Sequence, residues 1–138
     1  MEQAQGILEG LDERQRTAAT TLQGPVRIIA GAGAGKTRTV TRRIAYACAT
    51  GAWKPERVLA VTFSVKAAAE MRARLGQLGV GGGTGRSGLG AGTAGVTAAT
   101  FHSAALHQLN SVWADICEAP FPHVIEDQRD VVSQIGRA

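Results

Sequence analysis

The stretch that decides the fold alternates glycine with alanine and reads Ala30-Gly31-Ala32-Gly33-Ala34-Gly35-Lys36-Thr37. The phosphate-loop pattern asks for Gly, four residues and then Gly-Lys-Ser/Thr, and only Ala30 departs from it. Its glycines let the backbone curl so that N–H groups point inward. These donors and the N-terminus of the following helix form an anion site for the β- and γ-phosphates of a nucleotide. We predict that Lys36 stabilises the charge that develops during phosphoryl transfer and that Thr37 ligates Mg²⁺.

The segments around this loop predict a parallel α/β fold. An apolar, β-branched run at 26–30 is typical of a buried strand, and a helix is predicted over 36–49. The other predicted elements are a helix that opens at Asp12, strands at 58–62 and 96–99, and helices over 65–78 and 101–117. Helix and strand alternate, which favours a parallel sheet with right-handed crossovers. Because such a sheet needs cover on both faces, three strands indicate only the beginning of a larger sheet.

Other interpretations of the glycine-rich loop fit less well. A dinucleotide-binding loop needs a third glycine where Lys36 stands, so that spacing excludes it. A glycine-rich turn with a chance lysine is the bland alternative, which the strand–loop–helix frame disfavours. A phosphate loop alone indicates only an NTP-binding protein, since kinases, GTPases, transporters and motors all use one. The choice among these classes must come from other segments.

Composition and charge narrow the class of protein. The net charge is +4, and the excess is uneven, with 12 basic and 6 acidic residues up to Leu75 but 3 and 5 after it. A basic region favours a polyanion such as nucleotide or nucleic acid, although a solvated basic surface is the alternative. At least one of Arg42 and Arg43 is expected only to face solvent. Cys48 and Cys117 lack metal-type spacing and are expected to be buried free thiols in a reducing cytoplasm. No apolar run approaches the roughly 20 residues that span a membrane, so a soluble protein without membrane contact is expected.

Four segments with distinctive sequences follow one another along the chain. The first is Leu11-Asp12-Glu13-Arg14-Gln15-Arg16, and the second is the phosphate loop with its leading Ala30 and trailing Arg38. The third runs from Val58 to Met71 and includes Ala-Val-Thr-Phe-Ser-Val-Lys at 60–66. The fourth is Thr100-Phe101-His102-Ser103. In their sequences and order, these segments resemble the UvrD/Rep/PcrA group of superfamily 1 DNA helicases over roughly 11–109.

The resemblance implies how a nucleotide is held. The first segment is similar to the family's Q motif, so Gln15 would read adenine with an amide that both donates and accepts hydrogen bonds. The implied nucleotide-binding residues are Gln15, Ala30, Gly31, Ala32, Gly33, Ala34, Gly35, Lys36, Thr37 and Arg38, with ATP and Mg²⁺ as cofactors. Of these, Lys36 and Thr37 would take part in catalysis, and Thr37 would be the metal ligand.

The third and fourth segments are similar to motifs Ia and Ib, which line the single-stranded DNA channel in that family. The implied DNA-binding residues are Thr62, Phe63, Lys66, Thr100, Phe101 and His102. An aromatic ring at a strand end can stack on a base, which is worth roughly 1–3 kcal/mol per base, and the alternative is a core aromatic. The chain departs from the family at Ser64-Val65, where Thr-Asn is usual, and in a longer glycine-rich loop at 79–95.

The resemblance implies a RecA-like P-loop fold of which this chain holds only the N-terminal part of motor domain 1A. Residues 1–109 would be part of the ATP-binding domain, and 110–138 would begin an inserted helical subdomain. No strand ending in Asp-Glu is evident, since Glu126-Asp127 follows only two apolar residues. The remaining helicase domains, with their Asp-Glu pair and arginine finger, are expected C-terminal to this chain.

The implied function is ATP-dependent translocation along single-stranded or partially duplex DNA and unwinding of it, in the 3′-to-5′ direction. The chain alone is expected to be inactive. A second hypothesis is a truncated remnant that binds nucleotide or DNA without turnover. A third is a different P-loop enzyme such as a small kinase, which is disfavoured because no acceptor-site residues are visible while motifs Ia and Ib are.

Overall fold

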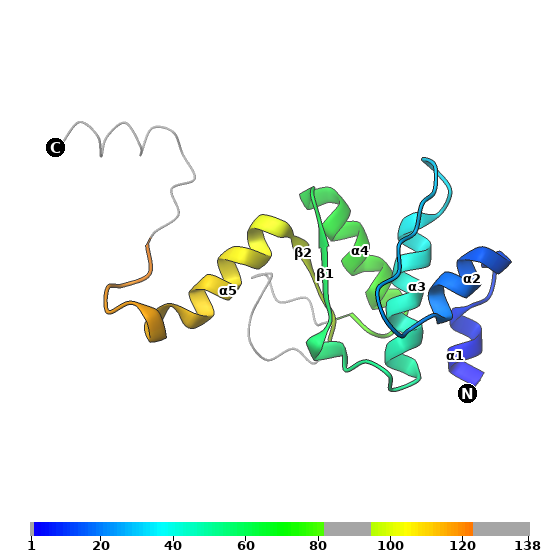
Figure 1. Cartoon of the computed structure of the whole chain (residues 1–138), viewed down its shortest axis with the longest axis horizontal. Coiled ribbons are helices and arrows are strands. Elements are labelled where there is room, and N and C mark those ends of the chain that lie inside the picture. The colour runs from blue at the N-terminus through cyan, green and yellow to red at the C-terminus, as the bar shows by residue number, and fades with distance from the viewer. Residues whose placement is uncertain (1, 82–94, 123–138) are drawn as a thin grey trace. The chain divides into compact units, whose positions relative to one another are not determined.

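The computed structural model describes residues 2–81 and 95–122 (Figure 1). The chain divides into two compact units, Met1–Ala104 and Ala105–Ala138. The elements in chain order are α1 (Glu2–Ile7), α2 (Glu13–Thr20), α3 (Lys36–Ala49), the short 3₁₀ helix η1 (Pro55–Arg57), β1 (Leu59–Thr62), α4 (Val65–Gln77), β2 (Thr97–Thr100) and α5 (Phe101–Ile116). The protein is therefore a mixed helix and strand structure with a small parallel sheet.

The sheet of the first unit is a parallel pair. β1 and β2 run in register from Leu59 opposite Thr97 to Thr62 opposite Thr100. α4 connects them and packs on both strands, while α3 packs on α4. The core that these elements share is made of Ile44, Ala60, Leu75, Val96 and Ala98. Because both strands end at the same edge, the residues that follow them, Phe63 and Phe101, leave the sheet on the same side.

The first two helices pack against the phosphate-loop helix. α1 and α2 both contact α3, and a second apolar cluster of Leu8, Leu11 and Ala19 packs against Tyr46 of α3. Asp12 is the N-cap of α2, as predicted, because its side chain accepts a hydrogen bond from the backbone of Gln15 at 2.8 Å.

Two arginines of α3 hold the ends of these helices. Arg42 donates to the carbonyl of Ile7, and Arg43 donates to the carbonyls of Ala18, at 2.7 Å, and Thr21. Cations at helix C-termini satisfy carbonyls that lack an intrahelical partner. The prediction that one of the two arginines only faces solvent is therefore wrong. Burial lowers the pKa of Arg43, whose guanidinium carbon also lies 5.3 Å from the centre of the Trp53 ring.

One predicted strand is absent. The run at 26–30 has no strand conformation, and Ile29 is 81% exposed. A strand is stabilised by hydrogen bonds to a neighbouring strand, and among the described residues β1 and β2 pair only with each other. The other predicted elements are confirmed within one or two residues at each end: helices over 36–49, 65–78 and 101–117, and strands at 58–62 and 96–99.

In the second unit, the Trp113 and Phe121 rings meet edge to face at 5.3 Å, and the Trp113 indole donates to the carbonyl of Ala119.

Both cysteines are free but half-buried, where burial was expected. None of the described helices combines the length and apolar character that a membrane crossing requires. Most of the glycine-rich loop at 79–95, and the Glu126-Asp127 pair, lie outside the described residues.

Candidate nucleotide-binding site

The phosphate loop ends in a backbone geometry that glycine accommodates. Gly33 and Gly35 have φ angles of 77° and 76°, in the left-handed region that disfavours side chains. Gly35 is the N-cap residue of α3, and no side chain in the described part of the protein caps that helix. The first N–H groups of α3 are thus left for another acceptor, and an anionic ligand suits them best.

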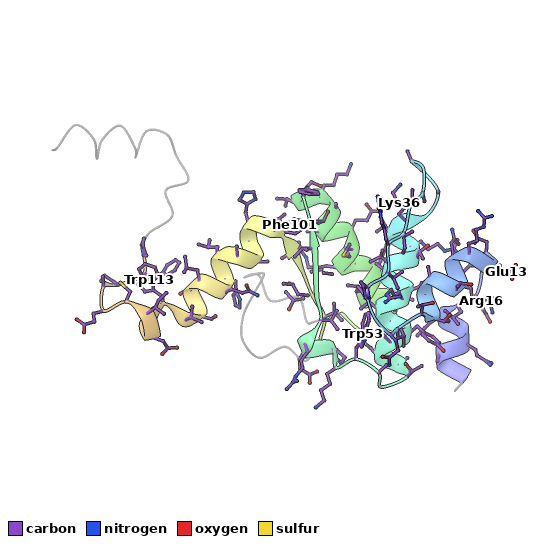
Figure 2. The ribbon with its side chains drawn as sticks, in the orientation of Figure 1. Glu13, Arg16, Lys36, Trp53, Phe101 and Trp113 are labelled. Atoms are coloured by element: carbon purple, nitrogen blue, oxygen red, sulfur yellow. The ribbon has the colours of Figure 1, made fainter. Side chains whose placement is uncertain are left out.

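Lys36 folds back over the start of the loop. Its Nζ atom donates to the carbonyls of Ala30, at 2.8 Å, and Gly31, at 2.6 Å. An ammonium group has three donors, so one remains for a ligand. Figure 2 shows Lys36 at the end of α3 that follows the loop, and the side chain is exposed. The arrangement therefore holds a positive charge beside the loop and leaves it open to an anion.

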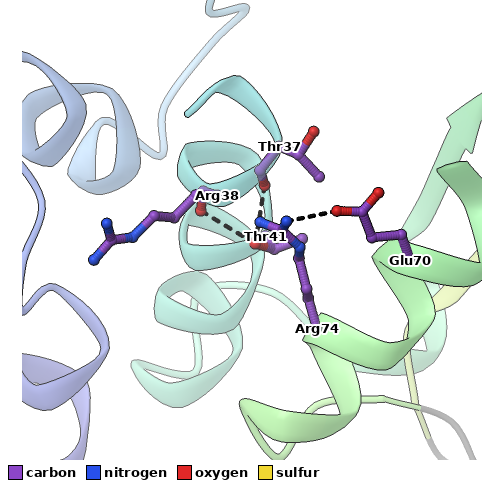
Figure 3. A network of polar contacts seen from close by, with 5 residues as sticks. All are labelled: Thr37, Arg38, Thr41, Glu70 and Arg74. Carbon is purple, nitrogen blue, oxygen red and sulfur yellow. Dashed lines mark hydrogen bonds and ion pairs between the residues drawn. The ribbon is translucent and has the colours of Figure 1, made fainter. Parts of the chain in front are cut away.

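Thr37 fits the role of a magnesium ligand. Its side chain is exposed, and its hydroxyl makes no hydrogen bond to the described residues. Mg²⁺ prefers hard oxygen ligands such as this hydroxyl. The backbone carbonyls of Thr37 and Arg38 both accept from the buried Thr41 hydroxyl, at 2.9 and 3.1 Å (Figure 3). This bond anchors the first turn of α3 to its second turn.

Gln15 reaches the phosphate loop from α2. Its Oε1 atom accepts from the backbone N–H of Asp12 at 3.2 Å, which completes a capping box with the bond from Gln15 N–H to Asp12. Its Nε2 atom donates to the carbonyl of Ala34 at 3.2 Å. Nε2 also lies 3.1 Å from the position that a Cβ at Gly35 would take. The structure therefore brings the predicted adenine reader and the predicted phosphate loop together.

Arg38 points towards the turn between α1 and α2. Its Nη2 atom lies 2.6 Å from where a Cβ at Gly10 would stand, and Gly10 has a φ of 70°. Figure 3 shows the Arg38 side chain directed away from α4, where Glu70 and Arg74 form an ion pair. The same turn leads into Gln15. The sequence reasoning missed Gly10, although a glycine directly before the Q-motif-like segment was a usable signal.

The residues predicted to bind DNA gather where β1 and β2 end. Thr62 and Thr100 are register partners at the ends of the two strands. Phe63 is 91% exposed and Phe101 is 47% exposed, and their ring centroids are 5.0 Å apart. Lys66, in the first turn of α4, and His102 are exposed as well. The reading of Phe63 as a core aromatic is thus excluded.

Hydroxyl groups fix the helix starts beside these aromatic rings. The Ser64 hydroxyl accepts from the N–H of Ala67 at 3.1 Å and caps α4. The Thr100 hydroxyl accepts from the N–H of Ser103 at 3.2 Å and donates to the Ser103 hydroxyl at 2.9 Å. The capping role of Thr100 was not predicted from the sequence. A threonine three residues before a serine is weak evidence for a cap, because Ser and Thr are common at many positions.

Comparisons with known proteins agree with these features. Residues 11–137 match the family model described as UvrD/REP helicase N-terminal domain. ATP-dependent DNA helicase UvrD2 of Mycobacterium tuberculosis is 49% identical over 110 residues, which are 80% of this chain and 15% of the relative. DNA helicase II of Escherichia coli is 39% identical over 131 residues, or 95% of this chain and 17% of the relative.

ATP-dependent DNA helicase PcrA of Bacillus subtilis is 41% identical over 97 residues, which are 70% of this chain and 12% of the relative. The chain thus spans between 12 and 17% of the length of these curated relatives. The resemblance inferred from the four segments is confirmed. The chain belongs to the UvrD/REP helicase N-terminal domain family.

Proposed function

We propose that this chain is the nucleotide-binding part of an ATP-dependent DNA helicase. The observation that carries the proposal is the phosphate loop, in which Lys36 and the uncapped start of α3 face one exposed site. Its relatives are named ATP-dependent DNA helicases, which favours a nucleic-acid motor over a kinase or GTPase. The chain would supply one wall of a cleft between two motor domains.

Different residues in and around the loop would bind different parts of ATP. The N–H groups at the start of α3 and the free donor of Lys36 would bind the β- and γ-phosphates. Thr37 would ligate Mg²⁺, which when bound neutralises charge on the phosphate oxygens. Gln15 and Arg38, on the side of α1 and α2, would contact the adenine end of the nucleotide.

The exposed aromatic pair, Phe63 and Phe101, would provide a surface that binds nucleic acid. Phe63 and Phe101 lie at the ends of β1 and β2, with Thr62, Lys66, Thr100 and His102 around them. Base stacking on aromatic rings tolerates any sequence, as a translocating protein requires. We propose single-stranded or partially duplex DNA as this partner and 3′-to-5′ as the direction of movement. The cytoplasm is the proposed compartment.

Turnover would need residues outside this chain. Phosphoryl transfer requires a positioned water, a secured Mg²⁺ and positive charge on the transferring oxygens, and an arginine finger alone is worth about 10³–10⁵ in rate. We propose that these groups lie in the remaining helicase domains, C-terminal to residue 138. The 138-residue chain should then bind ATP but hydrolyse it negligibly. DNA-stimulated turnover by this chain, abolished by Lys36→Ala, would refute that part of the proposal.

Calorimetry with Mg-ATP tests the nucleotide site. Lys36→Ala removes the only side-chain cation that contacts the loop backbone in the described structure, and we expect at least a tenfold loss of affinity, since hydrogen bonds to charged groups contribute about 1.5–3 kcal/mol. Lys54→Ala is the matched control because Lys54 is exposed and precedes η1. Equal affinity of Lys36→Ala and the unaltered chain would remove the phosphate-loop assignment. A longer protein that binds ATP through Lys36 but neither hydrolyses it nor moves on DNA would instead support the non-catalytic remnant.

A further inference from the structure

The amide of Gln15 is fixed by two different parts of the backbone. Oε1 accepts from the N–H of Asp12, and Nε2 donates to the carbonyl of Ala34. The two partners agree on one orientation of the amide, because an N–H can only donate and a carbonyl can only accept. The contact with Ala34 spans 19 positions of the sequence, so it links α2 to the phosphate loop.

This fixed amide still has capacity for a ligand. A glutamine side chain offers two donors and two acceptor lone pairs, and the structure uses one of each. One donor and one acceptor therefore remain, which match the edge of an adenine base. Reading adenine does not require Gln15 to release Ala34.

The loop itself has few other restraints. The N–H of Ala34 donates to the carbonyl of Gly31 in a long bond of 3.3 Å, and Lys36 bonds to Ala30 and Gly31 at the start of the loop. The second half, from Ala32 to Gly35, is exposed or only half-buried. A glycine-rich segment loses more conformational entropy on ordering than other segments, so each restraint that exists before binding reduces the cost of binding. Two side chains of the described residues bond to this second half. The Thr39 hydroxyl donates to the carbonyl of Gly35 at 3.1 Å from within α3, and Gln15 reaches Ala34 from α2.

We propose that Gln15 is a positioning residue for the phosphate loop, and that its bond to Ala34 raises affinity for the triphosphate group even when no base is present. The inference rests on the proposed function only in assuming that this loop binds phosphates. It gives the loop a support from α2 in addition to the recognition of adenine. A residue that reads only the base would leave affinity for a base-free polyphosphate unchanged.

Two substitutions isolate the donor that Gln15 provides. Gln15→Met is neutral and similar in length but lacks the amide. Gln15→Glu keeps an acceptor for the N–H of Asp12, so both bonds of the capping box remain, but it cannot donate to Ala34. Loss of the bond to the Asp12 N–H could explain a defect in the first variant, and added negative charge could explain one in the second. Only loss of the Ala34 bond is common to both. Gln77→Met, at the exposed end of α4, is the matched control.

The measurement is the affinity for inorganic tripolyphosphate with Mg²⁺, by calorimetry, beside the affinities for ATP and GTP. We expect both Gln15 variants to bind tripolyphosphate about fivefold more weakly than the unaltered chain, the effect of one net hydrogen bond of about 1 kcal/mol. The Gln77→Met control should stay within twofold. Circular dichroism shows whether each variant folds. If Gln15→Met does not fold, the tripolyphosphate affinity of Gln15→Glu at high salt tests the inference.

The outcomes separate this inference from the proposed function. Unchanged tripolyphosphate affinity in both Gln15 variants overturns the inference, even if discrimination between ATP and GTP is lost. If Lys36→Ala still abolishes polyphosphate binding in that case, the proposed nucleotide site stands. Failure of the unaltered chain to bind either ATP or tripolyphosphate would contradict the proposed function and the inference together.

Discussion

Two apolar runs of this chain have nearly the same sequence character but different structures. Residues 26–30 precede the phosphate loop and α3, while β1 precedes the Ser64 cap and α4. β1 pairs with β2, and its Ala60 is buried in the core. The run at 26–30 has no such neighbour among the described residues, and its Ile29 is almost fully exposed. Apolar sequence favours a strand, but only a hydrogen-bonded partner makes one.

The geometry of the phosphate loop does not depend on a strand before it. The loop keeps its left-handed glycines, its Lys36 contacts and its bond to Gln15 although no strand precedes it. Its geometry comes from local turns and from α2, whereas the β1–β2 pair depends on residues far apart in the sequence. The loop should therefore keep its geometry in this chain, although the run at 26–30 has no strand partner among the described residues.

The largest expected effect follows from supplying that partner. In a longer protein that includes the remaining motor domain, the amides of Ile28 and Ile29 should join a strand ladder. Their hydrogen exchange should then slow by at least about a thousandfold, since core strands exchange through openings that cost several kcal/mol. Amide exchange followed by mass spectrometry, in the 138-residue chain and in the longer protein, measures this. Equally fast exchange in both would show that 26–30 is not a strand of this fold.

The next effect contrasts the two regions within this chain. Leu75 is fully buried between α4 and the sheet, so Leu75→Ala should lower the free energy of unfolding by about 2–5 kcal/mol. Ile29→Ala should change it by less than about 0.5 kcal/mol, because the side chain is exposed. Urea unfolding of both variants gives the two values. A large loss from Ile29→Ala would mean that 26–30 packs against the core in solution.

How far the sequence predicts this protein depends on the range of the interactions involved. The caps at Asp12 and Ser64, the phosphate loop and helix α3 were all predictable, because each depends on neighbours within a few residues. The Gln15–Ala34 contact was not derivable from spacing, since it requires α2 to pack on α3. The side chains at the ends of β1 and β2 came from the family resemblance, and their exposure became known only from the structure. The prediction of a strand at 26–30 was wrong because the apolar pattern of these residues carries no information about a strand partner.

A smaller effect tests the support that the α1–α2 turn gives the site. Gly10→Ala and Gly24→Ala place a side chain at nearly the same φ, 70° and 68°, and each should cost about 1–2 kcal/mol of stability. A Cβ at Gly10 would also meet the Arg38 guanidinium, whereas Gly24 has open space. Only Gly10→Ala should therefore weaken ATP binding, by moving Arg38. Equal ATP affinities in the two variants would separate Arg38 from the nucleotide site.

The smallest effect concerns the core behind the sheet, where Cys48 packs. Burial, and secondarily the charge of Glu56, raises the pKa of the Cys48 thiol. A raised folded-state pKa means that the folded protein holds this proton more tightly than the unfolded chain does. The protonated Cys48 thiol therefore makes its full contribution to the free energy of unfolding below its unfolded-state pKa of about 8.5. That contribution is lost as the pH rises through the pKa of Cys48 in the folded protein.

Urea midpoints at pH 7.5 and pH 10 measure this loss, and Cys48→Ala should reduce the difference between them. Glu56→Gln should reduce it by less, because burial is the larger cause of the shift. The pH response should be confined to the core that Cys48 joins, so ATP affinity should not follow it, since the loop is held by separate contacts. An ATP affinity that changed with Cys48 ionisation would mean that the core and the phosphate loop are coupled through α3. The two regions would then not be held by independent contacts.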